Sequence, residues 1–233
     1  MRFDWEFLAD PRLAAGLISG LKMTLILSVC SALGALLIAI VLVIARIGGP
    51  RPLQLASRYY TDVARNVPVL ITLFFLYFGI TSLFPPSEYT FLRTPHLGAI
   101  ITVVAVSLVM GAFVSEVLRQ GVESVPVGQV EAAMASGLDA PSIYRHVVIP
   151  QLLPLILPGL SSEMVNVIKS TTFAMTIGVA DLMWHGQNLE SETFKGVETM
   201  TAISVVYFLL SFCTIAAFRG LEVIYQLPGA KTS

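Results

Sequence analysis

Long runs of residues without a charge dominate the pattern of hydrophobic and polar positions along the chain. Four runs hold about 20 or more uncharged positions each: 23–45, 66–87, 94–115 and 199–218. A fifth, 146–180, is interrupted only by Glu163 and Lys169. A helix of this length crosses a hydrocarbon core roughly 30 Å thick, and in lipid a helix satisfies its backbone groups within one segment. The pattern predicts five transmembrane helices, at about 19–46, 63–84, 96–119, 148–179 and 198–219.

The composition supports an all-α membrane protein. Hydrophobic residues make up 55% of the 233 residues and charged residues 12%, with a mean hydropathy of +0.80. A soluble domain usually carries about 25% charged residues, so this chain has too little polar surface to face water throughout. The net charge of −1 argues against nucleic-acid binding, which needs a basic patch. We expect one transmembrane domain over 1–233, with a polar connecting loop at about 120–148.

The distribution of basic residues predicts the orientation. Short loops on the cytoplasmic side of a membrane carry an excess of Lys and Arg. The loops after the first, third and fifth predicted helices are basic; they hold Arg46, Arg51, Arg58, Arg119, Arg145, Arg219 and Lys231. The loop before the fifth helix is acidic, with Glu190 and Glu192. The N-terminus is therefore predicted outside and the C-terminus in the cytoplasm.

The longest predicted cytoplasmic loop has helical signals of its own. Residues 129–136 are good helix formers, and Gly137 followed by apolar Leu138 is typical of a Schellman helix end. Asp139 can cap a second helix with Pro141 in its first turn. We expect two short helices on the inner membrane face, where they would form a docking surface.

The same loop resembles a known family. Glu131-Ala132-Ala133, then Gly137, then Val147-Val148-Ile149-Pro150 is similar to the EAA loop of bacterial ABC importer permeases, whose pattern is EAA, Gly and later Ile-x-Leu-Pro. The resemblance implies the transmembrane domain of a type I ABC importer. It assigns ATPase coupling to Glu131, Ala132, Ala133, Gly137 and Pro150. The helix that carries the EAA tripeptide is expected to sit in a cleft of a separate ATPase subunit.

Further segments resemble permeases of polar amino acids, in particular the HisM and glutamate/aspartate permease family. They are 65–78, with Asn66-Val67-Pro68 and a run of aromatics, 116–129, and 162–169. Gly159 and Thr72 depart from the family pattern. The resemblance implies import of a polar amino acid, glutamate or aspartate favoured, across the inner membrane by alternating access.

The resemblance also implies partners. They are a second permease subunit, identical or paralogous, two ATP-binding subunits, a periplasmic or extracellular binding protein, and membrane lipids. The chain contains no Gly-Lys dipeptide and so no G-x-x-x-x-G-K-[ST] phosphate loop. We therefore expect no cofactor in this chain, with ATP and Mg bound by the partner ATPase. The three histidines lack ligand spacing, so no metal site is predicted.

The fourth predicted span carries unusual polar residues. Pro150, Pro154 and Pro158 recur every four positions and predict a kinked start. Beyond them the polar residues are Glu163, Asn166, Lys169, Ser170 and Thr171. The first four fall at i, i+3, i+6 and i+7, roughly along one stripe. A central Glu or Lys costs roughly 2.5–3.5 kcal/mol in a bilayer, so such residues should face protein or water. We predict that the stripe lines the translocation pathway.

The roles within this stripe stay open. An amino-acid zwitterion needs an acceptor for its ammonium and a donor for its carboxylate, which Glu163 and Lys169 offer. Alternatively, these two residues pair with each other or with a partner subunit. Asp62 and Arg65 lie at the inner edge of the second span, where an ordinary membrane-edge role is favoured over substrate binding. Glu116 and Arg119, near the inner end of the third span, are candidates to gate or brace the coupling region.

Two other classes of protein compete with an ABC permease. A secondary transporter driven by an ion gradient would show inverted repeats with matching broken helices, and only one broken helix is visible. A membrane enzyme would need a nucleophile–base pair or a metal motif in its spans. Neither a Ser/His arrangement nor HExxH occurs, so we expect a transporter subunit and not an enzyme.

Overall fold

The computed structural model describes residues 11–83 and 95–225, and every regular element within these ranges is helical. The predicted end of the second span at 84, the start of the chain and Lys231 lie outside the described residues. Four helical segments are long and apolar enough to cross a membrane: Ala14–Gly48, His96–Glu123, Ala140–Ile177 and Gly196–Tyr225. A bent pair of helices supplies a fifth. The all-α membrane fold expected from the sequence is confirmed.

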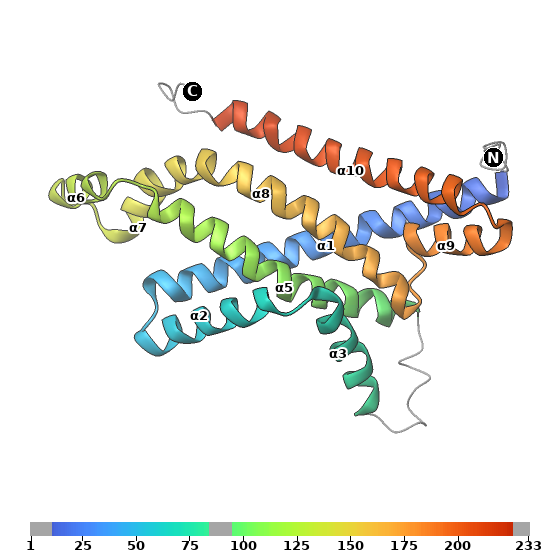
Figure 1. The fold of residues 1–233 in the computed structure, drawn as a ribbon. Helices are drawn as coiled ribbons and strands as arrows, with labels where there is room; N and C mark the ends of the chain where they lie inside the picture. The colour runs from blue at the N-terminus through green and yellow to red at the C-terminus, as the bar shows by residue number, and fades with distance from the viewer. Residues whose placement is uncertain (1–10, 84–94, 226–233) are drawn as a thin grey trace.

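The second span differs from the single helix expected at 63–84. The chain forms α2 (Arg51–Asn66) and α3 (Val69–Ser82), whose axes differ by 101°. The break falls at Val67, which is extended at φ −99° and ψ 125°. Pro68 explains it, because a proline disfavours the helical conformation of the residue before it. Figure 1 shows α3 leaving the bundle at this point.

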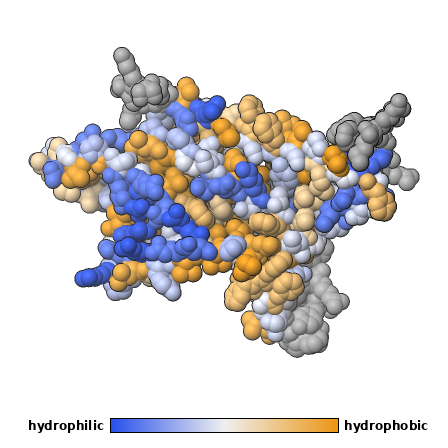
Figure 2. Space-filling model, in the orientation of Figure 1, coloured by the Kyte–Doolittle hydropathy of each residue, from blue (hydrophilic) through white to orange (hydrophobic). Residues whose placement is uncertain are grey.

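Helix α2 was not expected as an element because its charges exclude it from any uncharged run. It is strongly amphipathic: Ser57 and Thr61 are buried, while its arginines are exposed. The Ser57 hydroxyl donates to the Leu42 carbonyl at 2.9 Å, and the Tyr60 hydroxyl donates to the Leu108 carbonyl at 2.9 Å. These bonds tie α2 to two long helices. Figure 2 shows hydrophilic residues gathered over α2 and hydrophobic residues over α3.

The centre of the bundle is the contact of α1 (Pro11–Gly48) with α5 (Pro95–Glu123). Small residues allow it: Ala35 and Ala39 are fully buried, and a Cβ on Gly34 would lie 2.2 Å from the Ser107 hydroxyl oxygen. Helix packing in membranes depends on such close approach, because lipid tails provide no hydrophobic drive between helices. Helix α8 (Ile149–Thr171) adds Val167 to the same core.

The fourth span starts earlier than the expected 148. Helix α6 (Val127–Ala135) is a separate element, but α7 (Ala140–Ile143) continues through a π-helical turn, Tyr144–Val148, directly into α8. In the turn the Ile149 amide donates to the Tyr144 carbonyl, five residues back. Pro150 gives the reason: it has no N–H, and its ring clashes with the carbonyl four residues earlier in an α-helix. The wider turn accommodates the proline without ending the helix.

The chain after α8 narrows into the 3₁₀ turn Thr172–Ile177, then forms α9 (Leu182–Thr193) and α10 (Gly196–Tyr225). Helix α9 was not expected. It starts at Asp181, whose carboxylate accepts from the Trp184 amide at 2.8 Å. Helix α10 runs along the edge of the bundle beside α8 (Figure 1). Of the most apolar 18-residue stretch of α10 only 6% is buried, so most of the surface of this helix is available to lipid or to another chain.

Candidate functional site

Four of the five predicted coupling residues lie in a small module, α6 and α7 with the turn between them, that projects beyond the long helices (Figure 1). Its centre is a cluster of four buried side chains: Val125, Ala133, Ile143 and Val148. Ala133 therefore faces inward, whereas Glu131 and Ala132 are exposed. Within the EAA tripeptide, Ala133 therefore packs α6 against its neighbours, while Glu131 and Ala132 face outward.

The turn inside this module has the predicted geometry. Gly137 has φ +82°, its amide donates to the Met134 carbonyl at 2.9 Å, and the Leu138 amide donates to the Ala133 carbonyl at 3.2 Å. This pair of bonds is the Schellman motif, so the predicted helix end is confirmed. The predicted Asp139 cap is confirmed too: its Oδ1 accepts from the Ser142 amide at 3.3 Å. The hydrogen bond from Ser142 lowers the pKa of Asp139.

An open groove of about 510 Å³ lies between this module and the ends of α1 and α5. Val127, Met134 and Tyr144 line it, and their side chains are 70%, 58% and 42% exposed. Exposed apolar side chains bordered by charged ones, here Arg46, Arg119 and Glu123, are typical of a protein-binding surface. Pro150 is exposed but does not line this groove. Its observed place is after the π-helical turn at the start of α8.

Charged side chains of α1 and α5 form one wall of the groove. Arg46 Nη1 on α1 lies 2.6 Å from Glu116 Oε1 on α5, and Arg119 Nη2 lies 2.8 Å from Glu116 Oε2. Arg119 also pairs with Glu123. The Glu116 carboxylate is therefore bonded to two guanidinium groups while only 9% of the residue is exposed. Since Arg46 and Glu116 are 70 residues apart, sequence spacing gave no sign of this pair.

Four of the five predicted pathway residues line one shared groove of about 320 Å³: Glu163, Asn166, Lys169 and Ser170. Its other walls are Val69 of α3, Met110 and Phe113 of α5, and Phe173. The amide of Asn166 donates to Glu163 Oε2 at 3.2 Å. Among the described residues no ion pair within 4 Å joins Glu163 to Lys169, or either of them to another charge.

Ser170 and Thr171 are less accessible than the other pathway residues. Ser170 is 9% exposed, and its hydroxyl lies 3.9 Å from the Met110 sulfur. Thr171 is fully buried, with its hydroxyl oxygen 3.5 Å from that of Ser28 on α1. The next residue of an α-helix points about 100° away, so the helix turns Thr171 toward α1 and out of the groove. The structure does not bring Thr171 together with the other four residues.

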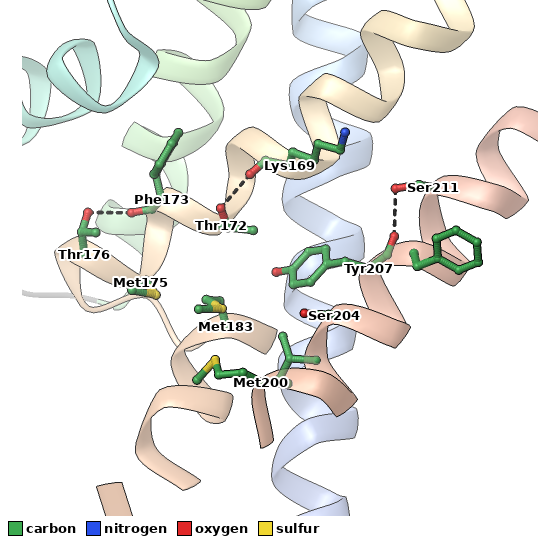
Figure 3. Close-up of a pocket in the computed structure, with 12 residues that line it drawn as sticks. Lys169, Thr172, Phe173, Met175, Thr176, Met183, Met200, Ser204, Tyr207 and Ser211 are labelled. Carbon is green, nitrogen blue, oxygen red and sulfur yellow. Dashed lines mark hydrogen bonds between the residues drawn. The ribbon is translucent and has the colours of Figure 1, made fainter. Parts of the chain in front are cut away.

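Lys169 also borders a second, larger cavity of about 600 Å³ (Figure 3). Figure 3 shows Lys169 and Thr172 on one side, Tyr207 and Ser204 on the other, and Met183 with Met200 between α9 and α10. The lysine therefore lies between two cavities, one with Glu163 and one rich in methionine. Sequence analysis missed this cavity because its walls come from three stretches, 169–176, Met183 and 200–211, that only the fold brings together.

A buried carboxylate lies at the start of α9. Asp181 is fully buried, its Oδ1 accepts from the Trp184 amide, and its Oδ2 has no hydrogen-bond partner among the described residues. Burial raises the pKa of Asp181 to about 6. The Leu182 amide donates to Thr24 on α1 at 3.1 Å, so this corner joins α9 to α1. Within the described ranges, no group of three or more His, Cys, Asp or Glu side chains is placed to hold a metal.

Residues 35–222 match the family described as "Binding-protein-dependent transport system inner membrane component". The chain is 33% identical over 226 residues to the octopine transport system permease protein OccM of Rhizobium radiobacter, covering 95% of this chain and 90% of that protein. It is 30% identical over 215 residues to the glutamate/aspartate import permease protein GltJ of Escherichia coli K12, covering 91% and 87%. A crystal structure of an amino acid ABC transporter with histidines aligns with a TM-score of 0.82 and 26% identity, covering 95% of this chain and 99% of that one.

These matches extend over nearly the whole chain and include both the α6–α7 module and the groove on α8. They agree with the family that the EAA loop indicated, and they leave an ion-gradient transporter without support. The chain belongs to the inner-membrane components of binding-protein-dependent transport systems, as a permease subunit of the polar amino-acid ABC importers.

Proposed function

We propose that the groove lined by Glu163, Asn166 and Lys169 receives the amino acid during translocation. The observation that carries this proposal is that both charges open into one groove without neutralising each other. A charge within a membrane helix is costly unless it meets a partner or water. Two opposite charges that do not form an ion pair with each other therefore indicate a functional role. Glu163 accepts from the substrate ammonium and Lys169 donates to a carboxylate, with Asn166 adding a hydrogen bond.

Among polar amino acids we favour glutamate or aspartate. Support comes from the resemblance of several pieces within 65–78, 116–129 and 162–169 to glutamate/aspartate permeases and from the cation of Lys169. The octopine permease relative is at least as similar to this chain as the glutamate/aspartate one. Overall likeness therefore does not select the cargo, and an uptake assay with a panel of amino acids decides it.

The groove is open and α10 is largely uncovered, which suits a second permease subunit, identical or paralogous, on the other side of the pathway. We propose that each permease subunit contacts one ATPase subunit through Glu131 to Gly137, and that the ATPase binds ATP and Mg. A binding protein delivers the amino acid from outside, where the N-terminus lies, and the C-terminus lies in the cytoplasm. Closure of the two ATPases then switches the pathway between outward and inward access.

Uptake by the complete importer reconstituted in liposomes tests the role of the groove. Glu163→Gln and Lys169→Met each remove a charge-assisted hydrogen bond, so uptake is expected to fall at least about tenfold. Glu192→Gln, on the exposed surface of α9, is the matched control and should retain uptake. Assembly with the ATPase should be unchanged in all three variants. Wild-type affinity and turnover in both groove variants would refute the pathway.

A further inference from the structure

Arg65 contacts an aromatic ring, whereas Arg46 and Arg119 form ion pairs with Glu116. Arg65 lies in the last turn of α2, and its guanidinium carbon is 5.3 Å from the centre of the Phe113 ring on α5. An arginine over an aromatic face is held by a cation–π interaction, and the edge of the guanidinium stays free to donate hydrogen bonds. The bonds from Ser57 and Tyr60 to α1 and α5 fix the position of α2 and so keep Arg65 over this ring.

Phe113 connects Arg65 to the proposed pathway. The same ring lines the groove that holds Glu163, Asn166 and Lys169. Val69, the first residue of α3, lines this groove as well, so the groove begins where the chain turns from α2 into α3. The sharp break at Pro68 therefore places the last turn of α2 beside the groove. A single helix over 63–84, as the sequence pattern predicted, would lack the break that forms this corner.

The guanidinium of Arg65 has no carboxylate partner among the described residues. Arg46 and Arg119 both bind Glu116, but Arg65 is absent from every ion pair within 4 Å. Asp62, one turn earlier on the same helix, is exposed and does not reach it. Arg65 is therefore an exposed cation that an aromatic ring orients. Glu116 acts on it through space but forms its ion pairs with Arg46 and Arg119.

We propose that Arg65 is a carboxylate-binding residue at the α2–α3 edge of the groove, and that it binds a carboxylate of the translocated amino acid. The proposal rests on the proposed role of the groove and names the chemical group of the substrate that this residue recognises. A guanidinium offers two parallel N–H donors that match the two oxygens of a carboxylate. Lys169 lines the same groove from α8 and provides a second cation, a compact point charge, for a carboxylate there.

The test is uptake by the reconstituted importer, with its ATPase and binding protein, of radiolabelled L-glutamate, L-glutamine, L-arginine and L-histidine. The best transported of these is then the probe. Arg65→Gln is expected to raise its half-saturation concentration at least about tenfold, and Arg65→Lys by less, because Lys keeps the charge but not the paired donors. Arg58→Gln, at an exposed arginine seven residues earlier on α2 that has no cation–π contact among the described residues, should change it less than about twofold.

Competition by the methyl ester of the probe distinguishes carboxylate binding from a structural role. The wild-type importer should prefer the free acid to the ester, and Arg65→Gln should lose most of this preference. If Arg65→Gln matches the wild type while Glu163→Gln is impaired, the groove is the pathway and the role of Arg65 is refuted. If both variants match the wild type, the proposed function of the groove itself fails. An unchanged preference for the acid in an impaired Arg65→Gln variant would also refute carboxylate binding.

Discussion

The α6–α7 module and the groove on α8 satisfy their polar groups in opposite ways. In the module the Schellman bonds at Gly137 and the cap at Asp139 pair the backbone groups of the turn locally, over four buried apolar side chains. In the groove, Glu163 and Lys169 carry opposite charges that the described part of the chain leaves unpaired. The module pairs the polar groups of its turn within itself, whereas the proposed function assigns the charges of the groove to a ligand from outside the chain. This difference is expected if one transmits force and the other binds a passing substrate.

The largest expected effect is on assembly through the module. Glu131→Arg combined with Gly137→Trp reverses an exposed charge and forces a bulky residue into φ +82°, a conformation that costs little only for glycine. We expect the ATPase to be lost on co-purification. Glu192→Arg makes the same charge change on α9 and is the control. Unaltered assembly of the double variant would count heavily against docking through α6.

The next effect concerns the charge network beside the module. Glu116→Gln removes the carboxylate that Arg46 and Arg119 share in a partly buried place, so at least two charge-assisted hydrogen bonds weaken and the free energy of unfolding should fall by roughly 3 kcal/mol. Glu123→Gln removes an exposed partner of Arg119 and should cost at most about 1 kcal/mol. Unfolding of the detergent-solubilised permease measures both. Equal losses would mean that Glu116 does not join α1 to α5.

A smaller effect is the pH dependence that comes from Asp181. Because burial raises its folded pKa to about 6, above the ordinary value of 3.8, the folded state binds more protons than the unfolded state between these values. Stability should therefore fall as the pH rises from about 4 to about 6, by up to about 3 kcal/mol, and stay level above. Asp181→Asn keeps the cap for Trp184 and should remove this slope. Parallel profiles for wild type and variant would contradict the buried, uncharged state of Asp181 at low pH.

The smallest effect is expected from the cap of α7. Asp139→Ala removes the acceptor for the Ser142 amide, so the midpoint of thermal unfolding should fall by no more than a few degrees. Asp139→Asn retains a good cap and should behave as the wild type does. If the unfolding midpoint of Asp139→Ala fell as far as that of Glu116→Gln, Asp139 would have a role beyond capping α7.

The sequence predicted the features that depend on neighbouring residues. The end of α6 at Gly137 and the cap at Asp139 were predictable because each depends on residues within a few positions. The uncharged runs located the long helices for the same reason. The stripe on α8 was also predictable in part, since helical spacing alone brings Glu163, Asn166, Lys169 and Ser170 to one groove.

Features that depend on distant residues or on charged helices were missed. Helix α2 contains three arginines, so a search for uncharged runs passed over it, and the break at Val67 was not expected although Pro68 was visible. The pairing of Arg46 with Glu116 and the contact of Arg65 with Phe113 join different helices. The inward turn of Thr171 depends on its contact with Ser28 of α1.

Whether Glu163 and Lys169 serve a substrate or each other is tested most directly by exchanging them. The double variant Glu163→Lys with Lys169→Glu keeps both charges and their spacing but reverses their order along the groove. If each residue binds one end of the amino acid, uptake by the reconstituted importer should stay at least about tenfold below wild type, as in the single neutral variants. Recovery of near wild-type uptake in the exchanged variant would show that the two residues act as an ion pair, and would contradict substrate binding in this groove.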